Sequence, residues 1–256
     1  MLCIIKNEDC LATMAKLPEG CVDLTVTSPP YDDLRTYKGY TFDFESVAKG
    51  LYRVTKLGGV VVWVVGDATI KGSETGTSFR QALYFKEIGF NLHDTMIWNK
   101  GGFSAVGALA VRYAPVFEYM FVFAKGKLKT FNPLKDKPNK NSGKIMAGTI
   151  RNNDGTTKPM VGSGEKVINE LGQRFNVWEM GPQRQSGEER HPAPFPEDLA
   201  GDHIVSWSNE GDLVYDPFMG SGTTGLMALR NKRRFIGSEI SAEYCASAKE
   251  RIENAS

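Results

Sequence analysis

Apolar residues along the chain form short runs that alternate with helical spacings, which predicts strands that alternate with helices. The most strongly β-like run is 60–65, six uncharged residues that are typical of a strand buried on both faces. Phe44, Val47, Leu51 and Val54 instead recur every three or four residues, which predicts one apolar helix face. This alternation favours an α/β fold with a mostly parallel sheet.

The same pattern predicts the remaining elements. Strands are expected at 3–8, 21–26, 60–65, 91–98, 116–123, 212–216 and 234–239. Helices are expected at 10–17, 44–56, 77–88, 197–208, 224–231 and 241–253, and Gly58-Gly59 is expected to end the second. Because no helical pattern separates 91–98 from 116–123, these two strands are expected to pair as an antiparallel hairpin within a seven-stranded sheet.

Charge is unevenly distributed along the chain. Residues 125–190 contain 13 Lys/Arg and 7 Asp/Glu, whereas the rest of the chain contains 18 and 23. The small net charge of +1 therefore hides a segment of +6, in which lysine, asparagine and glycine replace the periodic apolar positions. The chain is thus expected to consist of residues 1–125, an insertion at 126–190, and residues 191–256.

Composition argues against several classes of protein. No apolar run approaches the ~20 residues of a membrane span, and the start lacks the long apolar stretch of a signal peptide. The four cysteines, Cys3, Cys10, Cys21 and Cys245, show no Cys-x-x-Cys spacing, and with three histidines they give no metal-site spacing. We therefore expect reduced thiols, no metal and a cytoplasmic protein.

A stiff polar loop is predicted directly after strand 21–26, in the string Thr27-Ser28-Pro29-Pro30-Tyr31. Each proline fixes φ at about −65° and removes an N–H, so the carbonyls of the loop lose local donors. A hydroxyl, a carbonyl and an aromatic face so close together suit the gripping of a flat ring that bears an amine. The alternative is a bare Pro-Pro that ends a strand, with Tyr31 in the core.

A glycine turn far along the chain fits G-x-G-x-x-G with Gly220, Gly222 and Gly225, between a predicted strand and a predicted helix. Glu239 ends the next strand, 19 residues after Gly220, where a carboxylate accepts hydrogen bonds from ribose hydroxyls. NAD and S-adenosylmethionine both need that contact, and a tight turn without a ligand is a third reading. The residues 216–219 ahead of the turn, together with the loop at 27–31, favour the methyl donor.

Two strings together resemble the amino-methyltransferases of DNA, which modify N4 of cytosine or N6 of adenine. They are Asp-Pro-Phe-Met-Gly-Ser-Gly-Thr-Thr at 216–224 and Thr-Ser-Pro-Pro-Tyr at 27–31. Because the loop precedes the glycine turn, the order resembles the β class of that family, a circular permutation of the usual order. The resemblance implies a Rossmann-like methyltransferase fold with a catalytic half at 1–125, a target-recognition insertion at 126–190 and a cofactor-binding half at 191–256.

The resemblance also implies roles for individual residues. Ser28, Pro29, Pro30 and Tyr31 form the catalytic set, in which the Ser28 hydroxyl and the Pro29 carbonyl accept from the amine and Tyr31 stacks on a flipped base. The residues expected to bind S-adenosyl-L-methionine are Asp9, Cys10, Thr27, Phe195, Pro196, Asp216, Phe218, Gly220, Ser221, Gly222, Thr223 and Glu239. Those expected to bind double-stranded DNA are Arg35, Tyr37, Lys135, Lys137, Lys140 and Lys144.

Several functions stay open at this point. Ser28 stands where adenine enzymes usually carry Asp, which favours N4 of cytosine over N6 of adenine. Methylation of RNA or of a protein amide is a more distant alternative, since those families more often carry Asn before Pro-Pro-Tyr. An NAD enzyme would leave 27–31 unexplained, and a silent DNA-binding module would leave both motifs unused. The enzymes that the chain resembles are often homodimers and are often paired with a restriction endonuclease, and the sequence discloses neither partner.

Overall fold

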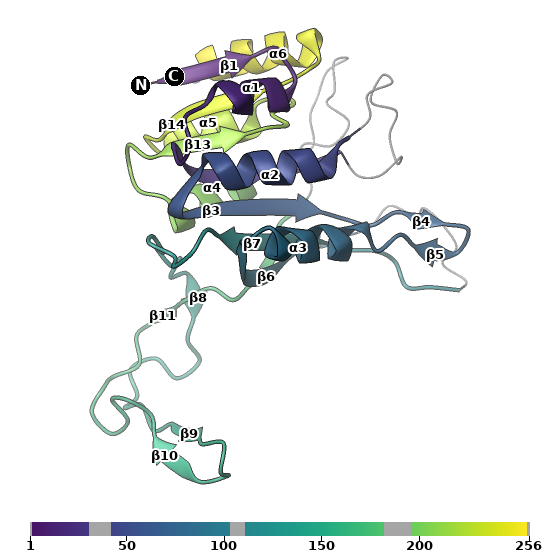
Figure 1. The fold of residues 1–256 in the computed structure, drawn as a ribbon. Coiled ribbons are helices and arrows are strands. Elements are labelled where there is room, and N and C mark those ends of the chain that lie inside the picture. Colours follow the sequence, from purple (N-terminus) through teal and green to yellow (C-terminus); the bar gives the residue numbers. More distant parts are fainter. Residues whose placement is uncertain (1, 31–41, 103–110, 182–195, 255–256) are drawn as a thin grey trace. The chain divides into compact units, whose positions relative to one another are not determined.

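A mixed eight-stranded sheet organises the protein in the computed structural model, which describes residues 2–30, 42–102, 111–181 and 196–254. The strand order is β1-β14-β13-β2-β3-β7-β6-β12, and the first five of these strands run parallel (Figure 1). Strand β7 runs antiparallel to both of its neighbours. The strands are β1 (Cys3–Lys6), β2 (Val22–Thr27), β3 (Thr55–Val65), β6 (Asn91–Asn99), β7 (Phe117–Ala124), β12 (Val177–Glu179), β13 (Leu213–Asp216) and β14 (Arg234–Ser238).

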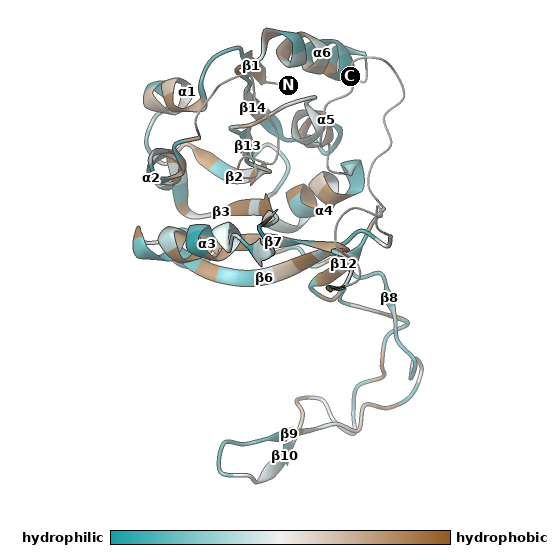
Figure 2. Cartoon of the chain, turned by 90° about the vertical axis from the view of Figure 1, so that its right-hand side faces the viewer, coloured by the Kyte–Doolittle hydropathy of each residue, from teal (hydrophilic) through white to brown (hydrophobic). Residues whose placement is uncertain are grey.

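Helices cover both faces of this sheet (Figure 2). Along β3, side chains alternate between the faces, so Val61, Trp63 and Val65 join a core with α1, α2 and α3, while the alternate valines are buried on the other face. Helices α4, α5 and α6 pack on that other face, against strands that include β2, β13 and β1. The helices are α1 (Cys10–Lys16), α2 (Phe44–Val54), α3 (Thr77–Glu87), α4 (Glu197–Trp207), α5 (Thr223–Arg230) and α6 (Ala242–Glu253).

The α/β fold with its mostly parallel sheet is confirmed, including the antiparallel pairing of β6 with β7. Two details were wrong. The sheet has eight strands rather than seven, because the short strand β12 pairs with β6 and buries Trp178. Gly58-Gly59 does not end a helix, because α2 stops at Val54 and the glycines lie in β3, where the pairing register with β2 shifts and Gly58 takes a φ of 86°.

The chain forms two compact units, one of residues 1–132 and 176–256, the other of residues 133–175. The first unit contains the sheet and its helices, and also a small hairpin of β4 (Thr69–Ile70) and β5 (Ser73–Glu74). The second unit contains two short antiparallel pairs. They are β8 (Lys137–Pro138) with β11 (Leu171–Gly172), and β9 (Thr149–Arg151) with β10 (Thr157–Pro159). The second unit spans fewer residues than the insertion expected at 126–190, and β12, which falls within that expected range, belongs to the main sheet.

Candidate active site

The two motif-bearing stretches meet at the carboxyl ends of adjacent parallel strands. Strand β2 ends at Thr27 and strand β13 ends at Asp216, and the two strands pair with Tyr215 opposite Thr25. The Thr27 hydroxyl donates a hydrogen bond of 2.7 Å to Asp216 Oδ1, although 189 residues separate them in the sequence. The two segments that carry the motifs are therefore joined where their strands end.

Asp216 is a buried carboxylate that joins these two segments. Its side chain is 2% exposed, and Oδ1 accepts a second hydrogen bond from the backbone N–H of Phe218 over 3.0 Å. Burial raises the pKa of Asp216 to about 6, while the hydrogen bond from Thr27 acts in the opposite direction. The carboxylate is thus ionised at about pH 7, where it holds the end of β2 against the start of the glycine turn.

The raised pKa of Asp216 predicts a component of stability that falls as pH rises from about 4 to about 6. An unfolded aspartate ionises at about 3.9, so the folded state holds the proton more tightly. Its contribution is complete below the unfolded pKa and is lost as pH rises through the folded one, with a slope of up to about 1.4 kcal/mol per pH unit. Denaturant unfolding across this range should show the component in the wild type and not in Asp216→Asn. Identical pH profiles for the two proteins would contradict the prediction.

The glycine turn needs a backbone that side chains disfavour. Gly220 has a φ of 52°, and Gly222, the N-cap of α5, has a φ of 79°. A Cβ on Gly225 would lie 2.6 Å from Phe235 Cε1, so this third glycine lets α5 pack closely on β14. The first two glycines thus shape the turn, and the third serves packing inside the protein.

Glu239 follows β14 directly and braces the same turn. Its Oε2 accepts a hydrogen bond from the Gly220 N–H over 2.9 Å, and its Oε1 accepts one from the Ser241 N–H over 2.8 Å. Asn7, just after β1, donates to the Glu239 carbonyl over 2.9 Å. Burial raises the pKa of Glu239 from its ordinary value. Because each carboxylate oxygen has more than one lone pair, Glu239 retains acceptor capacity for the hydroxyls of a ligand.

The described part of the polar loop leaves β2 over an aromatic cluster. Ser28 and Pro30 are half-buried, and Pro29 is buried. Trp63 lies opposite Thr27 in the pairing of β3 with β2, and its ring centroid is 6.3 Å from that of Phe218. The rigid ends of two strands and packed rings therefore support the point at which the loop starts.

Many residues expected to bind a cofactor have side chains that are engaged inside the protein. Those of Thr27, Asp216, Ser221 and Thr223 are buried. Burial also raises the pKa of the Cys10 thiol to about 12, so this cysteine is protonated and belongs to the apolar core. Their contacts with a cofactor stay predictions.

The remaining expected residues are distributed as follows. Asp9 is exposed and caps α1 by accepting from the Leu11 N–H, Phe218 is partly buried, and Pro196 is the buried N-cap of α4. In the second unit, Lys137 lies with Nζ 4.4 Å from the centroid of the Phe175 ring. Lys135, Lys140 and Lys144 of the same unit are exposed. Tyr31, Arg35, Tyr37 and Phe195 lie outside the described residues.

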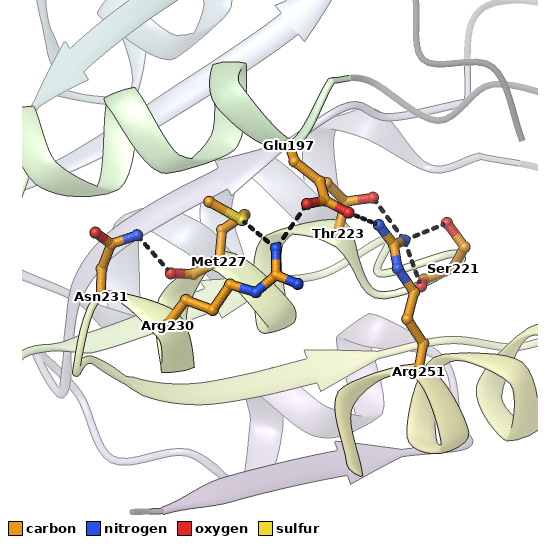
Figure 3. A network of polar contacts seen from close by, with 7 residues as sticks. All are labelled: Glu197, Ser221, Thr223, Met227, Arg230, Asn231 and Arg251. Carbon is orange, nitrogen blue, oxygen red and sulfur yellow. Dashed lines mark hydrogen bonds and ion pairs between the residues drawn. The ribbon is translucent and has the colours of Figure 1, made fainter. Parts of the chain in front are cut away.

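The sequence analysis missed three residues that hold the glycine turn. Thr224 donates through Oγ1 to the Val26 carbonyl over 3.2 Å, which joins α5 to β2. The only sequence signal for this role is its place as the second threonine of the Gly-Thr-Thr string. Arg251 of α6 donates to the Ser221 carbonyl over 3.1 Å and to Glu197 Oε1 over 2.7 Å (Figure 3). No local motif marks Arg251 or Glu197, because their proximity arises only in the folded chain.

The described residues offer neither a metal site nor a membrane-spanning helix. Within 2–30, 42–102, 111–181 and 196–254, no group of three or more His, Cys, Asp or Glu side chains is arranged to hold a metal ion. Over these residues no helix combines the length and the apolar character that crossing a membrane requires.

Comparison with known proteins places the chain among DNA-modifying enzymes. The family model of N6 and N4 DNA methylases matches residues 22–250. The orphan methyltransferase M.BamHII of Bacillus amyloliquefaciens is 58% identical over 240 residues, which cover 91% of this chain and 89% of that protein.

Two solved structures share the fold at lower identity. The PvuII DNA methyltransferase (cytosine-N4-specific) superposes with a TM-score of 0.72 at 22% identity, covering 100% of this chain and 91% of that chain. A DNA modification methylase of Thermus thermophilus, complexed with S-adenosyl-L-methionine, gives a TM-score of 0.66 at 24% identity, with coverages of 100% and 96%. At such identities the structures speak for the fold alone.

Proposed function

Because the chain belongs to the N6/N4 family of DNA methylases, we propose that it transfers a methyl group from S-adenosyl-L-methionine to the exocyclic N4 amine of a cytosine flipped out of double-stranded DNA. The observation that supports the proposal is the hydrogen bond between Thr27 and Asp216, which joins the strand end before Ser28 and Pro29 to the segment that leads into the glycine turn. The strand order supports a circularly permuted methyltransferase domain, since β13 and β14 from the end of the chain lie between β1 and β2.

Methyl transfer to an exocyclic amine requires acceptors for the amine hydrogens. The nitrogen lone pair is delocalised into the ring, and acceptors draw the hydrogens so that the lone pair is directed at the incoming methyl. The Ser28 hydroxyl and the Pro29 carbonyl take this role, and Tyr31 stacks on the base. Since the amine is unreachable inside a duplex, the base is extruded at a cost of a few kcal/mol, and stacking offsets part of it. Alignment of the reacting atoms supplies much of the rate.

The residues beside the glycine turn fit the proposed cofactor. When bound, S-adenosyl-L-methionine would supply an electrophilic methyl group on a sulfonium; the new nitrogen–methyl bond replaces the sulfur–methyl bond, S-adenosyl-L-homocysteine is the product, and the amine gives up one proton. Glu239 accepts from the ribose hydroxyls with the lone pairs that its two backbone donors leave, and the turn at Gly220 brings backbone close to the ligand. Asp9 lies two residues after Asn7, which bonds the Glu239 carbonyl, and so belongs to the same edge of the sheet.

The choice of cytosine as the proposed target base rests on Ser28. The family includes both N4-cytosine and N6-adenine enzymes, and the serine before Pro-Pro favours cytosine, with N6 of adenine as the alternative. Mass spectrometry of nucleosides from DNA treated with the enzyme and cofactor tests this choice, and N4-methylcytosine is the expected product. N6-methyladenine alone would overturn the choice of base. Methylation of RNA or of a protein amide, with DNA unmodified, would overturn the substrate class.

The second unit is the proposed DNA-recognition element. Residues 133–175 contain 8 Lys/Arg and 4 Asp/Glu, an excess of positive charge that suits phosphate contacts. Strands β9 and β10 form a two-stranded ribbon whose residues are all exposed, and such a ribbon fits the major groove of DNA. Arg35 and Tyr37 are proposed to line the path of the flipped base.

Neutralising four lysines of the second unit should weaken DNA binding and its dependence on salt. The changes are Lys135→Ala, Lys137→Ala, Lys140→Ala and Lys144→Ala in one protein. If most of them contact phosphates, the slope of log K against log salt should fall by about 3 units, because each contact releases about 0.9 counterion. Fluorescence anisotropy with a duplex over a range of salt measures both quantities.

The matched control removes the same charge from the first unit by replacing four exposed lysines with alanine. They are Lys49, Lys86, Lys232 and Lys249. This control should change the salt slope much less than the second-unit variant does. Equal slopes for the two variants would show that the effect reports net charge and not a DNA-binding surface.

The proposed cellular role is that of a modification enzyme without a dedicated endonuclease. The relative at 58% identity is named an orphan methyltransferase, and its name carries no endonuclease partner. We place the enzyme in the cytoplasm, as the composition predicts. A homodimer stays a prediction from the resemblance.

A further inference from the structure

Arg251 donates hydrogen bonds to several acceptors of the glycine turn at once. Its Nη1 donates to the Ser221 carbonyl over 3.1 Å, to Ser221 Oγ over 3.4 Å and to Thr223 Oγ1 over 3.1 Å. Its Nη2 donates to Glu197 Oε1 over 2.7 Å, and the arginine side chain is only 22% exposed. A planar guanidinium with five N–H groups can satisfy acceptors in different directions, which a lysine ammonium on a flexible stem does less well.

Arg251 and Glu239 bind the backbone of the turn in complementary ways, one as a donor and the other as an acceptor. Glu239 accepts from the Gly220 N–H, and Arg251 donates to the carbonyl of the next residue, Ser221. The backbone between them takes a left-handed conformation at Gly220 and Gly222, where glycine has the most freedom to move. The two charged side chains therefore limit the backbone motion of a segment whose glycines leave it conformationally free.

Glu197 extends this restraint to a second segment. It is the first residue of α4 and follows Pro196 directly, so its position sets where the chain enters the helix. Figure 3 shows its carboxylate between two guanidinium groups, with Oε1 bonded to Arg251 and Oε2 bonded to Arg230 over 2.7 Å. The start of α4 is thus joined through one carboxylate and one guanidinium to the glycine turn.

We propose that Arg251, through its bonds to Ser221, Thr223 and Glu197, is a positioning residue that preorganises the cofactor site by fixing the glycine turn to the start of α4. The inference rests on the proposed cofactor, S-adenosyl-L-methionine. Loss of the clamp lowers cofactor affinity, because binding must then order the turn. It leaves turnover at saturating cofactor nearly unchanged, because the contacts of Arg251 run to the glycine turn and to the start of α4.

Arg230 provides a matched control on the same carboxylate. It bonds Glu197 Oε2 and contacts Met227 Sδ over 3.8 Å, and neither contact belongs to the glycine turn. Arg230→Ala thus removes an interaction with Glu197 alone, whereas Arg251→Lys weakens both an interaction with Glu197 and the bonds to the turn. A loss of stability without any role in binding would appear in both variants.

The experiment measures the dissociation constant of S-adenosyl-L-methionine by calorimetry, together with the melting temperature without ligand and kcat at saturating cofactor. Arg251→Lys should weaken cofactor binding about tenfold, because part of the binding free energy then goes into ordering the turn, while Arg230→Ala changes it less than about twofold. Glu197→Gln should fall between them.

Three outcomes are distinguishable. Weaker binding confined to Arg251→Lys and Glu197→Gln, with kcat maintained, supports the positioning role. Unchanged or equally weakened binding in Arg251→Lys and Arg230→Ala overturns it, even if melting temperatures fall. Failure of the wild type to bind S-adenosyl-L-methionine overturns the proposed function instead.

Discussion

The Ser28→Ala enzyme is expected to bind cofactor with normal affinity and to methylate DNA about 10²-fold more slowly than the wild type. Removing one well-placed hydrogen-bonding group from a polar reaction site typically costs this much in kcat. Here the lost group is the acceptor that helps to direct the amine lone pair. Ser28 is half-buried and directly follows a strand end that Thr27 holds.

Single-turnover methylation with saturating cofactor and DNA is the measurement for this prediction, because it isolates the chemical step. Ser28→Thr keeps the hydroxyl and is the matched control, which should retain most of the activity. The dissociation constants for cofactor and DNA should match the wild type in both variants. Full activity in Ser28→Ala would remove the proposed mechanism, while equal loss in both variants would point to shape rather than to the hydroxyl.

Much of the fold follows from local patterns in the sequence. The run at 60–65 and the helical spacing from Phe44 to Val54 are dictated by burial on one or two faces, and β3 and α2 lie there. The circular permutation implied by the resemblance fits the strand order, in which β14 and β13 lie between β1 and β2.

Features that depend on distant partners could not be predicted from the sequence. Strand β12 has only three residues, too few for a sequence pattern to reveal, and it forms by pairing with the edge of β6, where Trp178 is buried. Gly58-Gly59 resembles a helix stop, but the backbone just after β7 takes up its hydrogen bonds, as in Gly58 N–H to the Lys125 carbonyl. In the sequence, nothing distinguishes Arg251 from an exposed arginine on a helix. Its role becomes visible only in the fold, where it bonds the glycine turn from α6.

The candidate site likewise combines features that local sequence patterns predict with features that depend on distant partners. The motifs marked Thr27 and Asp216 as candidate cofactor contacts, which stay predictions, and the fold adds that their side chains bond each other. Residue type alone does not distinguish a polar group that faces a ligand from one that holds the segments around it. Burial and partner atoms, which only the fold supplies, make that distinction.

Thr27→Val should lower the free energy of unfolding by about 1–3 kcal/mol, because it leaves the buried Asp216 carboxylate with one donor fewer. The substitution nearly preserves the shape of the side chain, so the loss reflects the hydrogen bond and not a cavity. It should also raise the pKa of Asp216 further, since the Thr27 bond favours the charged form. The pH range over which Asp216 affects stability then extends upward.

The same strand offers a nearly perfect control for this prediction in Thr25, two residues earlier. Thr25 and Thr27 are both 0% exposed, but among the described residues the Thr25 hydroxyl is a buried atom without a hydrogen-bond partner. Thr25→Val removes an unsatisfied polar group and should be neutral or stabilising by up to about 1 kcal/mol. Urea unfolding of both variants at about pH 7 separates the two effects. Equal destabilisation would mean that the link between the loop and the glycine turn contributes nothing beyond the packing of β2.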